Sequence, residues 1–249
     1  MKTLTVLSRK GGSGKTTVAV SVALAARQSG LKVVLADIDP LHSAAEVLRA
    51  RAEAMSLLFE STASKLFVLQ DACRQNGVDL LVVDTPTAPQ PDILRAINVS
   101  DFCLLVARPT ALDISAIRQS TTLVESTGCP ALIVFNQCPP LRDGREPKLV
   151  CNAVERLQVS RIPMARSKLR SRAAYQHAFA QHAGVTEADP NSEAASDVLK
   201  LLSEVSDRMM LRRRAELTEQ EHRMPGSVRA LLDRIGGFAP HRGLRENAA

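Results

Sequence analysis

The residues best suited to chemistry stand near the start of the chain, in the string Lys10-Gly11-Gly12-Ser13-Gly14-Lys15-Thr16-Thr17. Glycines leave backbone N–H groups open to phosphate oxygens and adopt freely the backbone angles that such a loop requires. Lys15 would place a positive charge on the β- and γ-phosphates, and the Thr16 hydroxyl would bind Mg²⁺. A helix beginning here adds the positive end of its dipole. The string predicts a loop that binds ATP and Mg²⁺ through Gly11, Gly12, Ser13, Gly14, Lys15, Thr16 and Thr17.

The sequence around this loop is what a phosphate-binding loop requires. An apolar run from Leu4 to Leu7 precedes it, and a second run from Val18 to Ala26 follows it, so the order is strand, loop, helix. The loop departs from the ordinary pattern by one residue, because Arg9 occupies the position of the first glycine. A glycine-rich turn with a chance lysine is the alternative interpretation, and the flanking runs disfavour it.

Two carboxylates follow the next apolar run. Residues 32–36 form a β-type run, and Asp37 and Asp39 come directly after it, two positions apart. That spacing places both side chains on the same side of a strand end, where they can face one site. The alternative is a simple turn at the strand end, where the Asp39-Pro40 pair is common.

A third carboxylate ends the run from Val78 to Val83. Asp84 follows this buried-strand pattern, as the metal-binding carboxylate of a Walker B segment does. We therefore expect Asp84 to hold Mg²⁺ through water.

Together, these segments resemble the deviant Walker A ATPases of the ParA/MinD family, which carry a lysine at the position of Lys10. The resemblance extends over roughly residues 1 to 206 and includes the segments 108–113 and 172–179. Members partition plasmids and chromosomes or position division sites and organelles. One departure follows Asp84, where residues 85–89 replace the Pro-Pro-Ser common in relatives.

The resemblance implies roles for four residues. Lys10 would cross a dimer interface to the phosphates bound by the other subunit, and a solvated loop lysine is the alternative. Asp37 would lie near the Mg²⁺ shell, and Asp39 would orient the attacking water. Asn136, after the run 131–135, would contact the adenine base, and a strand-end turn is the alternative.

The remaining chain alternates apolar runs and helical patterns, which predicts an α/β fold with a doubly wound, mostly parallel sheet flanked by helices. The ligand then belongs at the carboxyl ends of the strands. The length of 249 residues suits one such domain, residues 1–206, followed by a basic, partly helical extension, residues 207–249. Further strands are expected at 102–106 and 131–135, and further helices at 62–75, 93–99, 114–124 and 148–157.

The charge balance suggests a polyanionic partner. Lys and Arg number 32 against 26 Asp and Glu, and the pI is about 9.3. Part of the excess gathers between positions 161 and 172 with no acid among them, which could neutralise the phosphates of duplex DNA without reading its sequence. A solvated face of helix and loop is the alternative. The candidate DNA-binding residues are Arg161, Arg166, Lys168, Arg170 and Arg172.

The C-terminal stretch contains a second pattern. Apolar residues fall at helical spacing between positions 226 and 240, with arginines between them. This segment could pack on the domain, bind a partner or touch a membrane. The apolar residues are Val228, Leu231, Leu232, Ile235 and Phe238.

Two absences shape the expected location. No run approaches the roughly 18 apolar residues of a membrane span, and no signal peptide precedes the first strand, so a cytoplasmic protein is expected. The expected binding to DNA adds nucleoid association. The five cysteines lack metal-ligand spacing and are interpreted as small buried apolar residues.

The expected function is that of a ParA-like ATPase. It would form an ATP-sandwich homodimer, bind DNA non-specifically and move a cargo, either DNA or a protein assembly. A ParB-like or other cargo adaptor would stimulate hydrolysis. Two alternatives stay open: a MinD-like membrane-associated positioning ATPase, and a nucleotide-gated scaffold with little turnover.

Overall fold

A computed structural model describes residues 1–52 and 54–211 of the chain. Its centre is a seven-stranded sheet in the order β3-β2-β4-β1-β5-β6-β7, and every neighbouring pair of strands is parallel. The expected doubly wound parallel sheet is therefore confirmed. The strands are β1 (Lys2–Leu7), β2 (Val33–Asp37), β3 (Leu58–Glu60), β4 (Leu80–Asp84), β5 (Phe102–Ala107), β6 (Ala131–Cys138) and β7 (Met164–Arg170).

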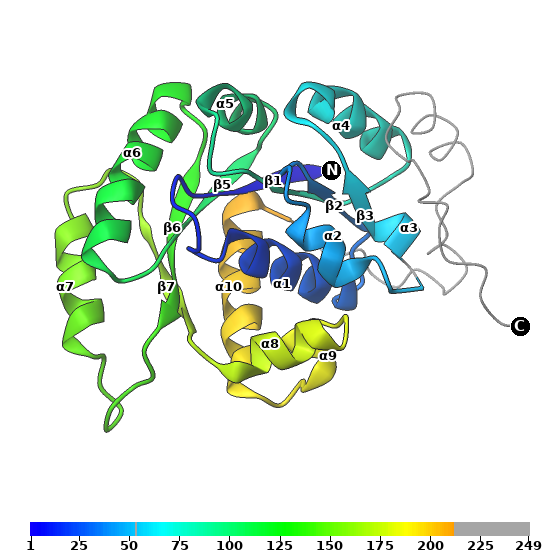
Figure 1. Ribbon diagram of the computed structural model, residues 1–249. Coiled ribbons are helices and arrows are strands. Elements are labelled where there is room, and N and C mark those ends of the chain that lie inside the picture. Colours follow the sequence, from blue (N-terminus) through cyan, green and yellow to red (C-terminus); the bar gives the residue numbers. More distant parts are fainter. Residues whose placement is uncertain (53, 212–249) are drawn as a thin grey trace, which may run out of the picture.

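Helices cover both faces of this sheet (Figure 1). Parallel strands need long crossovers, and here most crossovers contain a helix that packs back on the sheet. The helical segments are α1 (Lys15–Gln28), α2 (Ser43–Leu48), α3 (Ala54–Leu57), the 3₁₀ turn η1 (Ala63–Lys65), α4 (Leu66–Gln75), α5 (Gln90–Asn98), α6 (Ala111–Thr127), α7 (Lys148–Leu157), α8 (Ala173–Ala180), α9 (Val185–Ala188) and α10 (Glu193–Met209).

The core is divided by the sheet. On one face, α1, α2 and α8 to α10 pack against residues such as Leu4 and Val82. On the other face, α5 to α7 pack on β5 and β6, and α4 packs on β2 and β4. The central strands β2, β4 and β5 are buried along their whole length, which explains why they read as continuous apolar runs.

Two features differ from the sequence-based expectation. The basic residues after position 161 lie largely on the edge strand β7, not on a helix and loop. Residue 206, where the first domain is expected to end, lies within α10, which continues to Met209, and the boundary stays a prediction. The reading of all cysteines as buried is wrong for two of them, because Cys129 is half-buried and Cys151 is exposed. The apolar pattern at 226–240 lies outside the described residues.

None of the helices within the described part of the chain has the length and apolar composition needed to cross a membrane.

Candidate functional site

The glycine-rich loop connects the carboxyl end of β1 to the first residue of α1. Gly12 and Gly14 adopt φ values of +74° and +87°, which residues with a side chain rarely accept. A Cβ at Gly14 would also lie 2.1 Å from Nδ2 of Asn136. Gly11 has neither constraint, since a Cβ there would meet nothing within 4 Å. The loop conformation therefore depends on two of the three glycines.

Lys15 is the first residue of α1 and points into the protein. Its side chain is buried, and burial lowers the pKa of its ammonium group, while the charges of Asp84 and Asp39 act in the opposite direction. Thr16 and Thr17 follow at the same helix end, and the first turn of α1 contains no acidic residue. A positive helix end with a buried ammonium beside it suits an anion such as a phosphate.

Asp37 and Asp84 end adjacent parallel strands and lie opposite one another in the ladder. Both are fully buried. The oxygens of Asp37 accept hydrogen bonds from the backbone N–H groups of Asp39, at 3.2 Å, and Ala45, at 3.1 Å. Asp37 therefore fixes the turn between β2 and α2, and burial raises its pKa.

Asp84 is left without such support. Among the described residues, no hydrogen bond of ordinary geometry reaches either carboxylate oxygen, although the Thr16 hydroxyl lies near enough to favour the charged form. Burial raises the pKa of Asp84 from 3.8 to about 7, and the charge of Asp37 acts in the same direction. A buried carboxylate with both oxygens unused is costly unless a cation or its water shell binds it. The donor set of Asp84 and the Thr16 hydroxyl fits Mg²⁺.

Asp39 is half-buried in the turn that follows β2. One of its oxygens accepts a hydrogen bond from the backbone N–H of Leu41, at 3.0 Å. Asp39 therefore stabilises the turn at the strand end, and its charge also acts to raise the pKa values of Lys15 and Asp84. We call Lys15, Asp37, Asp39 and Asp84, together with the glycine-rich loop, the phosphate site.

Lys10 is half-buried and forms an ion pair within its own chain. Its Nζ lies 2.5 Å from Oδ2 of Asp113, whose side chain is 1% exposed near the start of α6. Asp113 also receives hydrogen bonds from Arg108 Nε, at 3.1 Å, and Thr110 Oγ1, at 2.5 Å. Burial would raise the pKa of Asp113, but these hydrogen bonds bring it to about 2. Lys10 is therefore held by a carboxylate of its own chain. Sequence reasoning missed Asp113, which its place in segment 108–113 could have indicated.

Asn136 supports the loop from β6, which continues beyond the predicted end at 135 to Cys138. Its Nδ2 donates to the carbonyl of Ser13 at 2.9 Å, and Gln137 Nε2 donates to the carbonyl of Gly12 at 3.3 Å. These bonds make Asn136 a buried brace for the loop backbone. Its contact with an adenine base stays a prediction.

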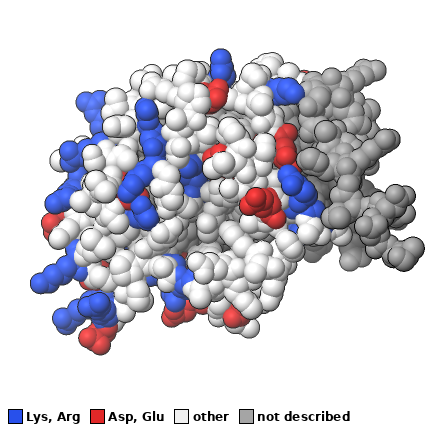
Figure 2. Space-filling view, in the orientation of Figure 1, with Lys and Arg blue, Asp and Glu red and all other residues white. Residues whose placement is uncertain are grey.

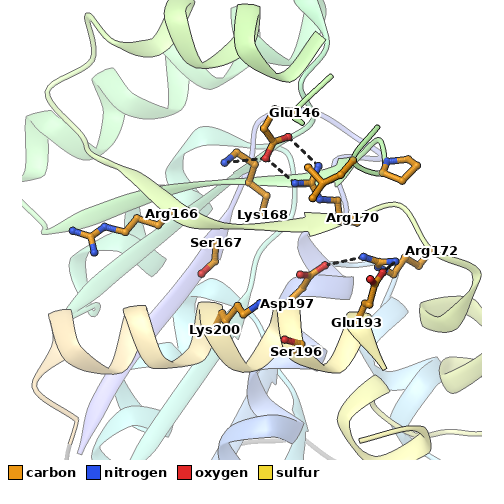
Figure 3. Close-up of a pocket in the computed structure, with 12 residues that line it drawn as sticks. Glu146, Arg166, Ser167, Lys168, Arg170, Arg172, Glu193, Ser196, Asp197 and Lys200 are labelled. Atoms are coloured by element: carbon orange, nitrogen blue, oxygen red, sulfur yellow. Dashed lines mark hydrogen bonds and ion pairs between the residues drawn. The ribbon is translucent and has the colours of Figure 1, made fainter. Parts of the chain in front are cut away.

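The predicted DNA-binding residues lie elsewhere, on β7 and its flanks. Figure 3 shows most of them around a cavity of about 420 Å³ between β7 and α10. We call Arg161, Arg166, Lys168, Arg170 and Arg172 the basic edge.

Acids from distant segments neutralise three members of the basic edge. Arg170 is buried and forms two hydrogen bonds with Glu146, at 2.7 and 3.0 Å, and Lys168 lies 3.4 Å from the same carboxylate. Arg172 pairs with Glu193 and with Asp197. Edge-strand N–H groups of residues 166 and 167 donate to Glu204 on α10.

Arg161 and Arg166 differ from these three. Both side chains are exposed, and the described part of the chain gives neither an ion pair. The side chain of Arg166 extends away from the paired residues in Figure 3. Lys and Arg side chains also gather on the α6 and α7 side of the molecule (Figure 2), and the exposed cations there include Arg118, Lys148 and Arg156.

Comparisons with known proteins agree with this geometry. The protein-family model of the CobQ/CobB/MinD/ParA nucleotide-binding domain matches residues 4–210 of the sequence. Maintenance of carboxysome distribution protein A of Halothiobacillus neapolitanus is 28% identical over 214 residues, which are 82% of this chain and 95% of that protein. Protein ParA of Rhizobium radiobacter is 31% identical over 128 residues, 50% of this chain and 56% of that protein.

Among solved structures, the septum site-determining protein MinD of Pyrococcus horikoshii OT3, complexed with Mg-ADP, is similar in fold. The TM-score is 0.66 and the sequence identity 16%, over 83% of this chain and 96% of that chain.

Proposed function

The chain belongs to the CobQ/CobB/MinD/ParA family of nucleotide-binding domains, and from that premise we propose that it is a ParA-like ATPase that positions a cargo. It forms a dimer around two ATP molecules, binds DNA non-specifically and is reset when an adaptor stimulates hydrolysis. The cargo is DNA or a protein assembly.

One observation carries the nucleotide chemistry: the unpartnered, buried carboxylate of Asp84 lies near the buried ammonium of Lys15, at the positive end of α1. Removing either charge from water is costly, and a bound Mg²⁺-nucleotide compensates both. When bound, Mg²⁺ would supply positive charge that offsets the negative charge developing on the terminal phosphate.

The residues of the phosphate site then have separate roles in binding and hydrolysis. The loop N–H groups and Lys15 would hold the phosphates, and Thr16 and Asp84 would hold Mg²⁺, Asp84 through water. Asp39 orients the water that attacks the γ-phosphorus and has one oxygen engaged in its turn. Asp37 maintains the turn that carries Asp39.

Dimer formation requires Lys10 to exchange partners. In the single chain, Asp113 holds Lys10 at 2.5 Å, and in the proposed dimer the lysine reaches the phosphates of the partner subunit. Phosphates carry more negative charge than one carboxylate, so nucleotide on the partner favours the exchange. Asp113 keeps Arg108 and Thr110 as hydrogen-bond donors after Lys10 leaves.

The proposed DNA contact relies on the exposed cations. Arg161 and Arg166 are the members of the basic edge best placed to bind phosphates, because Lys168, Arg170 and Arg172 already pair with acids. The cations on α6 and α7 extend the same positive surface (Figure 2).

Binding of the purified full chain to a non-specific DNA duplex tests this function. The measurement is made without nucleotide, with ADP and with ATP, the ATP case at two salt concentrations and beside anionic liposomes. We expect binding only with ATP, weaker at higher salt. Liposome binding without DNA binding would instead make the protein a membrane-associated positioner. ATP binding with negligible turnover in the presence of DNA and adaptor would make it a nucleotide-gated scaffold.

The Asp39→Ala variant tests the sandwich dimer separately. Loss of the water-orienting carboxylate is expected to stop turnover while ATP still binds, so the dimer accumulates. Light scattering at saturating ATP should give twice the monomer mass. A monomer under these conditions would contradict the dimer model.

A further inference from the structure

Two of the five cysteines lie close together, one on β5 and the other in the loop that follows α6. The Sγ atoms of Cys103, on β5, and Cys129, just before β6, lie 3.6 Å apart. A disulfide requires about 2.0 Å, so an approach of roughly 1.6 Å would join them. The two residues are 26 positions apart in the chain. The other cysteines, Cys73, Cys138 and Cys151, have no sulfur partner among the described residues.

The surroundings make the two thiols chemically unequal. Cys103 is fully buried, and its pKa is raised well above the usual range by its hydrogen bond to Cys129 and by burial. Cys129 is half-buried, and the hydrogen bond from Cys103 lowers the pKa of its thiol. The thiolate is the nucleophile in thiol chemistry, so the accessible Cys129 is the one that reacts first.

We propose that Cys129 and Cys103 form a peroxide-reactive dithiol site, in which Cys129 reacts first with the peroxide and Cys103 then completes a reversible disulfide. The Cys129 thiolate attacks one peroxide oxygen, an S–O bond forms, the O–O bond breaks and the released hydroxide takes up a proton as water. Cys103 then gives up its proton, its sulfur attacks the Cys129 sulfur, and the S–O bond breaks to release a second water. Two thiols are oxidised and one peroxide is reduced.

The pair lies away from the glycine-rich loop, so a disulfide is expected to change stability and not ATP binding. Cys103 is near the amino end of β5, whereas the glycine-rich loop follows the carboxyl end of the parallel neighbour β1. The disulfide closes a loop that contains all of α6 and restrains the unfolded chain. We therefore expect a rise in Tm of about 4 °C or more in the oxidised protein, with ATP affinity unchanged.

Oxidation of the reduced full chain with increasing hydrogen peroxide tests the site. Remaining thiols are alkylated, and the digest is compared by mass spectrometry with and without dithiothreitol. We expect a Cys103–Cys129 linked peptide that dithiothreitol removes. The Cys151→Ser variant, which changes an exposed cysteine outside the pair, should give the same yield, and Cys129→Ser should give none.

Either of two results would overturn the proposal. One is a Cys129 that proceeds to sulfinic acid in the wild type as fast as in Cys103→Ala. The other is a wild-type protein in which Cys103 and Cys129 both stay alkylatable while Cys151 is oxidised. If a variant fails to fold, the wild-type digest and the Tm of oxidised against reduced wild-type protein still decide the outcome.

Discussion

The phosphate site and the basic edge both concentrate charged side chains, but within the described part of the chain the buried charges are unpaired in the first and paired in the second. In the phosphate site, the buried carboxylate of Asp84 has no hydrogen bond of ordinary geometry, and burial lowers the pKa of Lys15 although the charges of Asp84 and Asp39 act in the opposite direction. In the basic edge, Arg170 is also buried, but it donates two hydrogen bonds to Glu146 and one to the carbonyl of Pro139. An unsatisfied buried charge points to a missing ligand, whereas a satisfied one points to a structural role.

The largest effect should come from Lys15→Ala. Because this buried ammonium is the fixed charge that faces the phosphates, its loss is expected to weaken ATP binding by about 100-fold or more. Calorimetric titration with ATP measures the change. Lys148→Ala is the matched control, since Lys148 is also the first residue of a helix, α7, but is exposed. Equal ATP affinity of wild type and Lys15→Ala would mean that the phosphate site does not bind ATP through Lys15.

Arg170→Ala should destabilise the fold and not act mainly on DNA. It leaves Glu146 with only Lys168 and removes a hydrogen bond to the carbonyl of Pro139, so we expect a loss of about 2 kcal/mol in the free energy of unfolding. Urea denaturation followed by circular dichroism measures it. Arg161→Ala, an exposed arginine nearby, should change stability by less than about 0.5 kcal/mol. An Arg170 variant as stable as wild type but unable to bind DNA would show that Arg170 binds DNA and does not stabilise the fold.

Asp84→Asn should stabilise the nucleotide-free protein. The pKa of Asp84 rises from 3.8 in the unfolded chain to about 7 in the fold, so the folded state holds a proton that the unfolded state releases. Wild-type stability contributed by this group therefore falls as the pH rises from about 4 to above 7. At pH 8 the amide removes that cost, and we expect a gain of about 2 kcal/mol.

The gain should nearly vanish at pH 4, which is the internal control for Asp84→Asn. Thermal unfolding at both pH values measures it beside Asp71→Asn, an exposed acid on α4. A variant less stable than wild type at pH 8 would mean that an interaction of the charged carboxylate outweighs its burial.

The smallest effects should come from Arg161→Ala and Arg166→Ala. Each removes one exposed cation, so each should weaken ATP-dependent DNA binding a few-fold and lower the salt dependence by about one phosphate contact. Fluorescence anisotropy with a labelled duplex at several salt concentrations measures both. An unchanged salt slope in the double variant would place the DNA contact on α6 and α7 instead.

The sequence predicted most of the fold because its signals are local. The runs ending at Leu7, Asp37 and Asp84 became adjacent parallel strands, and their carboxyl ends meet as expected. The short α3 and β3 are not among the elements expected from the sequence, because they acquire their shape from packing on β2.

The parts that sequence could not predict depend on partners far away in the chain. Asp113 is 103 positions from Lys10, and Glu146 is 24 from Arg170. A basic run without acids in its own segment therefore looked free of ion pairs, although α10 and the loop after β6 supply them. Asn136 was placed at a strand end because its contact with Ser13 cannot be read from periodicity.

We propose that Asp84 lacks a partner because a metal-bound nucleotide supplies one. Calorimetric titration of wild type and Asp84→Asn with ATP, each with Mg²⁺ and with chelator, measures this dependence. We predict that Mg²⁺ strengthens ATP binding to wild type at least tenfold and leaves binding to Asp84→Asn nearly unchanged. An equal Mg²⁺ effect in both proteins would mean that Asp84 does not hold the metal.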